Sequence, residues 1–275
     1  MAQISPAELH GSNEPILLRQ DEGAICTLTL NRPDARNSLS ENMLAALDET
    51  LEAMAASREI KVVILAANGP VFCAGHDIRE MQAHRGDPDK GEAFFEAMFQ
   101  ACSSVMQKIV ACPKPVIAAV EGTATAAGCQ LVATCDLAVA SDEAKFCTPG
   151  VHIGLFCSTP AVAVARNIGR KRAMEMLLLG EMVAAEDALS YGLVNRVVAK
   201  ADVLQTARGL AETIASKSAA ANAIGKKIFY QQIGSPLDDA YACAGRAMVE
   251  NMMFDDADEG LGAFLDKRQP QWRDS

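Results

Sequence analysis

Aromatic residues and positive charge are scarce in this sequence. Phe, Tyr and Trp make up 5% of its 275 residues, and the net charge is −10. An acidic chain repels the phosphates of nucleic acids and of anionic lipids, so we expect neither nucleic acid nor a membrane as a partner. Half of the residues are hydrophobic, which predicts a globular protein with a large core. An anionic small molecule would have to be held by a local group of Lys and Arg side chains.

Paired metal-ligand motifs, leader segments and long apolar runs are also missing. The nine cysteines, an odd number, include no C-x-x-C pair, which favours buried free thiols in a reducing compartment over disulfides or a metal site. Residues 1–20 contain neither a basic segment followed by an apolar one nor an Arg-rich helix, and no run is long enough to span a membrane. We therefore expect a cytoplasmic protein without a bound metal.

Strands and helices alternate along the first part of the chain. This alternation predicts right-handed βαβ units and a mostly parallel sheet. Beyond residue 160 nearly every segment has helical spacing of its apolar residues. We expect an α/β core over residues 1–200 and a helical region over residues 201–275. The predicted strands are 15–20, 24–30, 61–67, 115–122 and 136–141, and a helix capped by Ser40 runs to about residue 56.

Two short turns of small residues carry the clearest chemical signal. FCAGHDI (72–78) and the segment around Ala126-Ala127-Gly128 each lead from an apolar strand into a helix. Such turns expose backbone N–H groups at the positive end of a helix, where an oxygen with negative charge is stabilised. If the two turns converge, their amides form an oxyanion hole. An ordinary strand-to-helix turn, in which Gly75 permits the bend and Asp77 caps the helix, is the alternative for the first segment.

Six segments in order resemble the crotonase, or enoyl-CoA hydratase/isomerase, superfamily. Within it the chain is most similar to the enoyl-CoA hydratase domain-containing subgroup, which shares stretches such as PGVxIGLFCSTP. The resemblance implies a crotonase-like spiral of ββα units, C-terminal helices that build a trimer or a dimer of trimers, and an acyl-CoA thioester as substrate. Coenzyme A would then be part of the substrate, with no permanently bound cofactor. The segments are 30–39, 72–81, 114–129, 135–146, 173–198 and 260–270.

The resemblance also implies roles for single residues. The oxyanion donors would be the backbone N–H groups of His76 and Ala127, although the family's second turn is usually richer in glycine. For the basic residues among the expected coenzyme A contacts, an ordinary solvated surface charge is the alternative. The contacts implied are Arg32, Arg36, Ala74, Ile78 and Arg79, together with Lys267, which would reach the ligand of a neighbouring subunit.

Both catalytic glutamates of a hydratase are missing. Gln130 and Gly150 stand at their positions, and neither side chain exchanges a proton near neutral pH. We therefore expect feeble hydratase activity. His152 is the one side chain of the following loop that titrates near neutral pH. It either faces the pocket as a catalytic residue or is bonded to a loop carbonyl.

Three functions follow from these observations. The first is an acyl-CoA enzyme that relies on oxyanion stabilisation, for which decarboxylation of a malonyl-type thioester needs no base. The second is a weak or remnant enoyl-CoA hydratase. The third is a non-catalytic acyl-CoA binder. The Gly-His-Asp form of the first turn resembles the malonyl-type decarboxylases of the superfamily.

Overall fold

A parallel sheet forms the centre of the computed structural model, which describes residues 14–275. Its strand order is β1-β2-β3-β5-β7-β10, and only β1 runs antiparallel, to β2. The hairpin closes at Gly23, whose φ of 60° suits glycine. Residues 1–13 of the predicted core lie outside the described part. The strands are β1 Leu17–Glu22, β2 Ile25–Leu30, β3 Val62–Ala67, β5 Val116–Val120, β7 Leu137–Ser141 and β10 Arg196–Val198.

A second, smaller sheet lies beside the first and carries the two small-residue turns. Its order is β4-β6-β8-β9, with β4, β6 and β8 parallel and β9 antiparallel to β8. Parallel strands put their carboxyl ends at the same edge, so the segments after β4, β6 and β8 emerge together. The bounds are β4 Val71–Cys73, β6 Thr123–Thr125, β8 Lys145–Cys147 and β9 Val183–Ala184.

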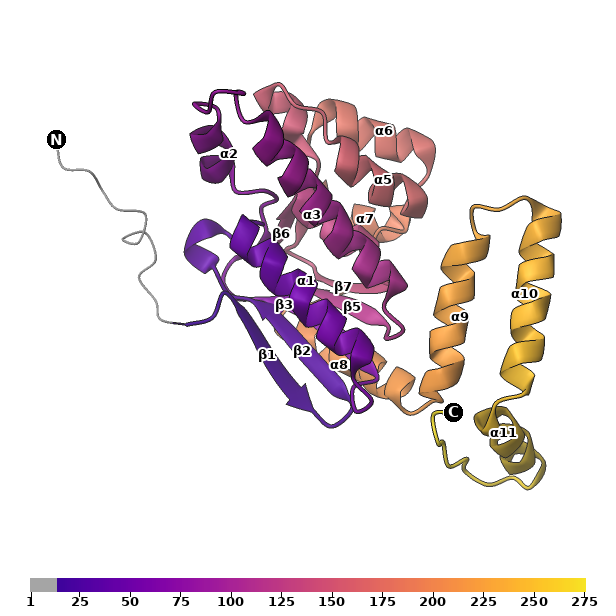
Figure 1. The fold of residues 1–275 in the computed structure, drawn as a ribbon. Coiled ribbons are helices and arrows are strands. Elements are labelled where there is room, and N and C mark those ends of the chain that lie inside the picture. Colours follow the sequence, from indigo (N-terminus) through magenta and orange to yellow (C-terminus); the bar gives the residue numbers. More distant parts are fainter. Residues whose placement is uncertain (1–13) are drawn as a thin grey trace.

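Helices cover both faces of the main sheet (Figure 1). Strand β3 shows the reason, because Val63 and Leu65 join one apolar cluster while Val62 and Ile64 join another. Helices α1 and α3 pack together over the first cluster, and α8 covers the second by packing against β3, β5 and β7. The bounds are α1 Glu41–Ala56, α2 Ile78–His84, α3 Glu92–Ala111, α4 Ala127–Thr134, α5 Ser158–Asn167, α6 Arg170–Leu179, α7 Ala185–Tyr191 and α8 Val203–Ala215.

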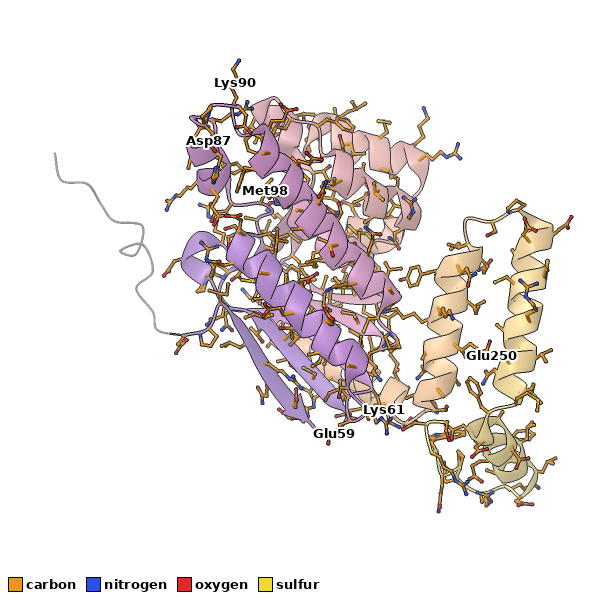
Figure 2. The ribbon with its side chains drawn as sticks, in the orientation of Figure 1. Glu59, Lys61, Asp87, Lys90, Met98 and Glu250 are labelled. Carbon is orange, nitrogen blue, oxygen red and sulfur yellow. The ribbon has the colours of Figure 1, made fainter. Side chains whose placement is uncertain are left out.

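The last helices form an arm that stands beside this core (Figure 1). The arm consists of α9 Ala219–Gln232, α10 Leu237–Met252 and α11 Asp255–Leu265. Of the helices in the predicted region 201–275, α8 packs on the core sheet, and the arm begins at Ala219. In Figure 2 side chains fill the space between the sheet and its helices, and Glu250 is labelled on α10, where it borders a groove shared with α9 and the end of α3.

A buried polar group fastens the arm to the core. Lys226 of α9 donates to Asp136 Oδ2 at 2.6 Å and to the carbonyls of Ile109 and Lys114, and Tyr230 donates to Asp136 Oδ1 at 2.9 Å. The side chains of Lys226 and Asp136 are 7% and 16% exposed. Burial, followed by the neighbouring carboxylate, raises the pKa of the Tyr230 hydroxyl.

The sequence prediction of the core elements agrees with the structure. Every strand predicted from an apolar run is present, and Ser40 caps α1 by accepting the Met43 N–H at 3.2 Å. The nine cysteines all carry free thiols, eight of them buried. Among residues 14–275 no helix combines the length and apolar character that membrane crossing requires.

Candidate active site

The first turn follows β4 and is held by the loop before α1. Gly75 has a φ of 93°, a conformation that favours glycine. Its carbonyl accepts the Leu39 N–H at 2.8 Å, and Ala74 donates its own N–H to the Arg36 carbonyl at 3.1 Å. Asp77 then caps α2 by accepting the Arg79 N–H. The backbone of residues 74–77 is therefore fixed from one side by residues 36–39.

The second turn follows β6 and meets the first. A Cβ built on Gly75 would lie 2.9 Å from the Ala126 Cβ and 3.2 Å from the Ala127 nitrogen. Thr125 adds a hydrogen bond of 2.9 Å from its hydroxyl to the Ala74 carbonyl. The two turns predicted from separate parts of the sequence thus lie in direct contact.

Neither His76 nor Ala127 donates its backbone N–H within the described residues. His76 lies outside the helices, and Ala127 is the first residue of α4, so helix geometry gives its N–H no partner. Gly128 lets α4 start this close to β4, because a Cβ there would overlap the Cys73 carbonyl. Two N–H groups from contacting turns are the arrangement that binds a carbonyl oxygen as it gains negative charge.

Ala126 adopts a backbone conformation that glycine normally supplies. Its φ is 50° and its ψ is −120°, and for a residue with a Cβ such a conformation costs about 1–3 kcal/mol. Its N–H donates to the Cys147 carbonyl at 2.9 Å, and its carbonyl accepts the Gln130 N–H at 3.0 Å. These bonds hold the strained residue in place, and the strain sets the start of α4 at Ala127.

Three buried polar side chains around this turn have no hydrogen-bond partner among residues 14–275. The side chains are those of His76, Gln130 and Thr148. The atoms without a partner are both ring nitrogens of His76, the Gln130 Oε1 and the Thr148 Oγ1. Gln130 and Thr148 are 4% and 0% exposed. Burial lowers the pKa of His76, and a weaker hydrogen-bond interaction with the Leu39 backbone opposes this shift. The ring packs edge-on against Phe99 of α3 at 5.4 Å between centroids.

Comparison with known proteins agrees with this geometry. The sequence profile described as "Enoyl-CoA hydratase/isomerase" matches residues 20–275. The chain belongs to the enoyl-CoA hydratase/isomerase family. A solved enoyl-CoA hydratase from Mycobacterium smegmatis is 52% identical, with a TM-score of 0.90 over 94% of this chain and 99% of that one. Solved human enoyl-CoA hydratase domain-containing protein 3 is 44% identical, with a TM-score of 0.89 over 94% of this chain and 100% of that one.

The same subgroup appears among the sequence relatives. "Enoyl-CoA hydratase domain-containing protein 3, mitochondrial" from Rattus norvegicus is 46% identical over 92% of this chain and 83% of its own length. The predicted fold, the crotonase family and the subgroup are therefore confirmed, and the chain is an enoyl-CoA hydratase-like protein.

The cytoplasmic prediction is wrong by the same comparison. The relatives from rat, human and mouse are named mitochondrial proteins. The prediction depended on the lack of a recognisable leader in residues 1–20, and residues 1–13 lie outside the described part of the chain. A missing motif in one sequence was too weak a reason to assign a compartment.

Gln130 and Gly150, predicted from the resemblance to stand where a hydratase has two glutamates, lie in different surroundings. Gln130 extends from α4 one turn after Ala126, so its side chain leans back toward the turn. Gly150 lies in the 3-10 turn Pro149–Ile153, where an added Cβ would be 2.8 Å from the Leu155 carbonyl and 2.9 Å from the Cys157 sulfur. A side chain at 150 would require residues 155–157 to move.

His152 belongs to the 3-10 turn Pro149–Ile153 and lies beside the C-terminal end of α6. Its Nε2 is 3.2 Å from the Gly180 carbonyl, and Gly180 ends that helix with a φ of 65°. This contact matches the alternative in which a loop carbonyl bonds the ring. Nothing among the described contacts joins His152 to His76 or Ala127, so its catalytic role stays a prediction.

The predicted coenzyme A contacts divide into paired and exposed residues. Arg32 is 12% exposed and bonds to the Asp77 carboxylate at 3.2 Å. Burial alone would raise the pKa of Asp77, but hydrogen bonds from the Arg79 N–H and Ser38, together with Arg32, lower it. The exposed ones are Arg36, Ile78 and Arg79, beside the first turn, and Lys267, on the segment that follows α11.

Neither Phe99 nor Thr148 is among the site residues that the sequence predicts. Phe99 lies on α3, whose outer face borders an open groove of about 570 Å³. Met98 and Met106, on the inner face of α3, are core residues that are 4% and 6% exposed (Figure 2 labels Met98). Helical spacing separates the two faces of α3 but does not say which face adjoins the first turn. Thr148 has no local signal, since its burial depends on the pairing of β6 with β8.

Proposed function

We propose that this chain binds acyl-CoA thioesters and stabilises their enolate form through the backbone N–H groups of His76 and Ala127. The observation that carries the proposal is the contact of the two turns, in which a Cβ at Gly75 would lie 3.2 Å from the Ala127 nitrogen. Oriented donors of this kind stabilise charge that develops on a carbonyl oxygen. The names of the relatives, which all refer to enoyl-CoA, support a thioester as the ligand.

The coenzyme A portion would lie over the loop before α1 and the start of α2. Arg36 and Arg79 are exposed cations on these two segments. The turn before α2 is bonded to the loop before α1 through the Ala74 N–H and the Arg36 carbonyl. Phosphate groups require such local cations on a chain with a net charge of −10. Arg32 plays a different part, because its bond to Asp77 fixes the turn itself.

Hydration of an enoyl thioester is disfavoured by the surroundings of Gly150. The reaction needs one group to take a proton from water and another to deliver one to carbon. Gln130 does neither, and a carboxylate at position 150 would collide with the Leu155 carbonyl and the Cys157 sulfur. We expect the double variant Gln130→Glu and Gly150→Glu to gain no hydration of crotonyl-CoA. A sharp gain would revive the hydratase alternative.

Decarboxylation of a malonyl-type thioester is the reaction class that suits such a site. The C–C bond to the carboxylate breaks, carbon dioxide leaves, and the electron pair moves onto the thioester oxygen between the two N–H groups. Water then protonates the carbon of the enolate. No general base is needed, so the missing carboxylates are no obstacle. The non-catalytic binder differs only in the absence of turnover.

A panel of thioesters, with products detected by mass spectrometry, distinguishes the decarboxylase from the non-catalytic binder. Malonyl-, methylmalonyl- and crotonyl-CoA are incubated with the protein, and calorimetry measures their binding. Turnover of a malonyl-type thioester supports the decarboxylase, and binding without turnover supports the binder. Absence of any binding overturns the proposed function.

The variant Ala127→Pro tests the oxyanion donor itself. Proline is tolerated at the first position of a helix, where it removes an N–H that has no helical partner. We expect turnover to fall by about 10²–10³-fold. Arg170→Pro places proline at the exposed first residue of α6 and is the control for proline at a helix start. Because Ala126, unlike Gly169, is not extended, circular dichroism must also show that Ala127→Pro keeps its fold. Equal turnover of both variants would exclude Ala127 as a donor.

We also infer that copies of the chain associate through the arm, as a trimer or a dimer of trimers. Met253, directly after α10, is 79% exposed, and Phe264 and Leu265 of α11 are 81% and 78% exposed. A second apolar surface on α6 includes Leu178 at 58% and Leu179 at 48%. Two different surfaces on one chain suit head-to-tail contacts that close into a ring. Lys267, next to α11, would then lie near a neighbouring copy.

A further inference from the structure

Asn37 is a fully buried polar residue in the loop before α1. The residue is 0% exposed, and its φ is 51°. Burying an amide costs free energy, and so does a positive φ in a residue with a Cβ, although Asn tolerates this conformation better than most residues. The contacts that Asn37 makes must therefore offset both costs.

The side-chain amide of Asn37 joins its own loop to the start of β4. Its Nδ2 donates to the carbonyls of Asn68 at 2.9 Å and Val71 at 2.8 Å. Its Oδ1 accepts the Arg32 N–H at 2.8 Å, and the Asn37 N–H donates to the Arg32 carbonyl at 2.9 Å. The amide therefore closes its own loop and also ties that loop to the chain where it enters β4.

The two residues that flank this asparagine hold the first turn, which follows β4. The Arg36 carbonyl accepts the Ala74 N–H at 3.1 Å. The Ser38 hydroxyl donates to the Asp77 carboxylate at 3.1 Å. The loop is thus bonded to the chain on both sides of β4. The proposed donor His76 lies inside the segment that these bonds hold, so the direction of its N–H depends on them.

Asparagine suits this position better than aspartate or glycine. Its planar amide offers two donors and one acceptor oxygen, and the two donors face the carbonyls of Asn68 and Val71. Aspartate has the same shape but would turn an acceptor toward both carbonyls. Glycine adopts the positive φ freely but supplies none of the three side-chain bonds.

We propose that Asn37 is a positioning residue of the candidate site, which fixes both the direction of the His76 N–H and the place of the Arg36 cation. Both polar atoms of its side chain are bonded within the chain, so it acts through these two segments and not on the ligand. The inference rests on the proposed function, because the two segments must first bind the thioester oxygen and coenzyme A. Loss of the amide should therefore weaken both interactions at once.

The probe for the donor is para-dimethylaminocinnamoyl-CoA. Hydrogen bonds to its thioester oxygen draw charge from the amino group along the conjugated chain, so binding between two donors moves its absorption to longer wavelength. The variants are Asn37→Asp, which keeps the shape of the side chain, and Asn37→Gly, which keeps the φ. We expect each variant to lose about half of the wild-type red shift, since one of two donors is misplaced. Calorimetry with coenzyme A alone should show about tenfold weaker binding, as the loss of one charged hydrogen bond implies.

Asn167→Asp is the matched control for a merely structural role. Asn167 of α5 also donates its Nδ2 to two carbonyls, those of Ala133 at 2.7 Å and Ala163 at 2.9 Å. The control should lower the thermal midpoint but keep both the red shift and the affinity for coenzyme A. An equal loss of red shift in the control overturns the inference, because the shift would then follow stability alone.

The remaining outcomes separate this inference from the proposed function. A wild-type protein that does not bind the probe, or binds it without a red shift, removes the proposed oxyanion hole and the inference together. A red shift that persists in full in folded Asn37→Gly removes only the positioning role. Failure of both Asn37 variants to fold removes it as well, because Asn37 would then serve overall stability. The absorption needs no turnover, so the test applies equally to an enzyme and to a binder.

Discussion

The core and the arm differ in how far their large apolar side chains are exposed. In the core, Phe72 and Phe146 are 1% and 0% exposed, whereas Phe264 and Leu265 of the arm are 81% and 78% exposed. The interior of the core is therefore closed by its own side chains, although α6 exposes Leu178 and Leu179, and the arm leaves large apolar side chains exposed in the single chain. The turns that build the candidate site all belong to the core. The comparison indicates that site geometry depends on close packing within one chain, while the arm is held to the core by a few polar contacts and leaves large apolar side chains exposed.

The largest effect is expected where the core is most tightly packed. A Cβ on Gly128 would overlap the Cys73 carbonyl, so Gly128→Ala should lower the free energy of unfolding by more than about 4 kcal/mol. Urea denaturation measures the loss. Gly209→Ala is the control, because Gly209 lies in α8 with no atom within 4 Å of an added Cβ, and it should gain about 0.5–1 kcal/mol. Similar stability of the two variants would contradict the tight contact of the turns.

Much of the core could be predicted from local sequence alone. Apolar runs identify the buried strands, and Ser40 caps the beginning of α1 as predicted. Residue types also show that positions 130 and 150 lack carboxylates. These features can be predicted because each depends only on residues within a few positions along the chain.

Contacts between distant segments could not be predicted. Arg32 pairs with Asp77 across 45 positions, so a cation expected to meet phosphate is already bonded. The burial of Thr148 follows from the register that aligns Thr125 with Cys147. The exposure of the arm is another such case, since the spacing of apolar residues in α10 and α11 does not tell whether the same chain or another one covers them.

Breaking the buried ion pair between Lys226 and Asp136 should weaken the attachment of the arm to the core. Lys226→Met leaves the Asp136 carboxylate, 16% exposed, without its cation, and loss of one member of such a pair costs about 3–5 kcal/mol. We expect a lower thermal midpoint and faster tryptic cleavage near Lys217. Lys227→Met is the matched control, because the neighbouring Lys227 is exposed and makes no ion pair within residues 14–275. Equal behaviour of the two variants would show that the pair does not hold the arm.

A charge on the apolar surface of the arm should separate the copies. Phe264→Asp puts a carboxylate at a side chain that is 81% exposed in the single chain. If that side chain is central to an interface, the dissociation constant should rise at least about 30-fold. Analytical ultracentrifugation measures it, and circular dichroism should show an unchanged fold. Gln231→Asp adds the same charge at an exposed polar position of α9 and should leave assembly unchanged. Assembly of Phe264→Asp at wild-type strength would exclude this surface.

The smallest effect concerns the ion pair that fixes the first turn, and it depends on pH. The pKa of Asp77 is lowered in the native state, so its ionised form adds stability that is complete above the unfolded value near 3.8 and is lost as pH falls through the native value. Asp77→Asn keeps an oxygen to cap α2 but no charge for Arg32. We expect the variant to be less stable by about 1 kcal/mol at pH 7, and the difference should vanish in acid. Asp34→Asn, at an exposed position, should match the wild type throughout. If the stability difference between Asp77→Asn and the wild type persists unchanged in acid, altered packing of the turn and not the loss of charge destabilises the variant.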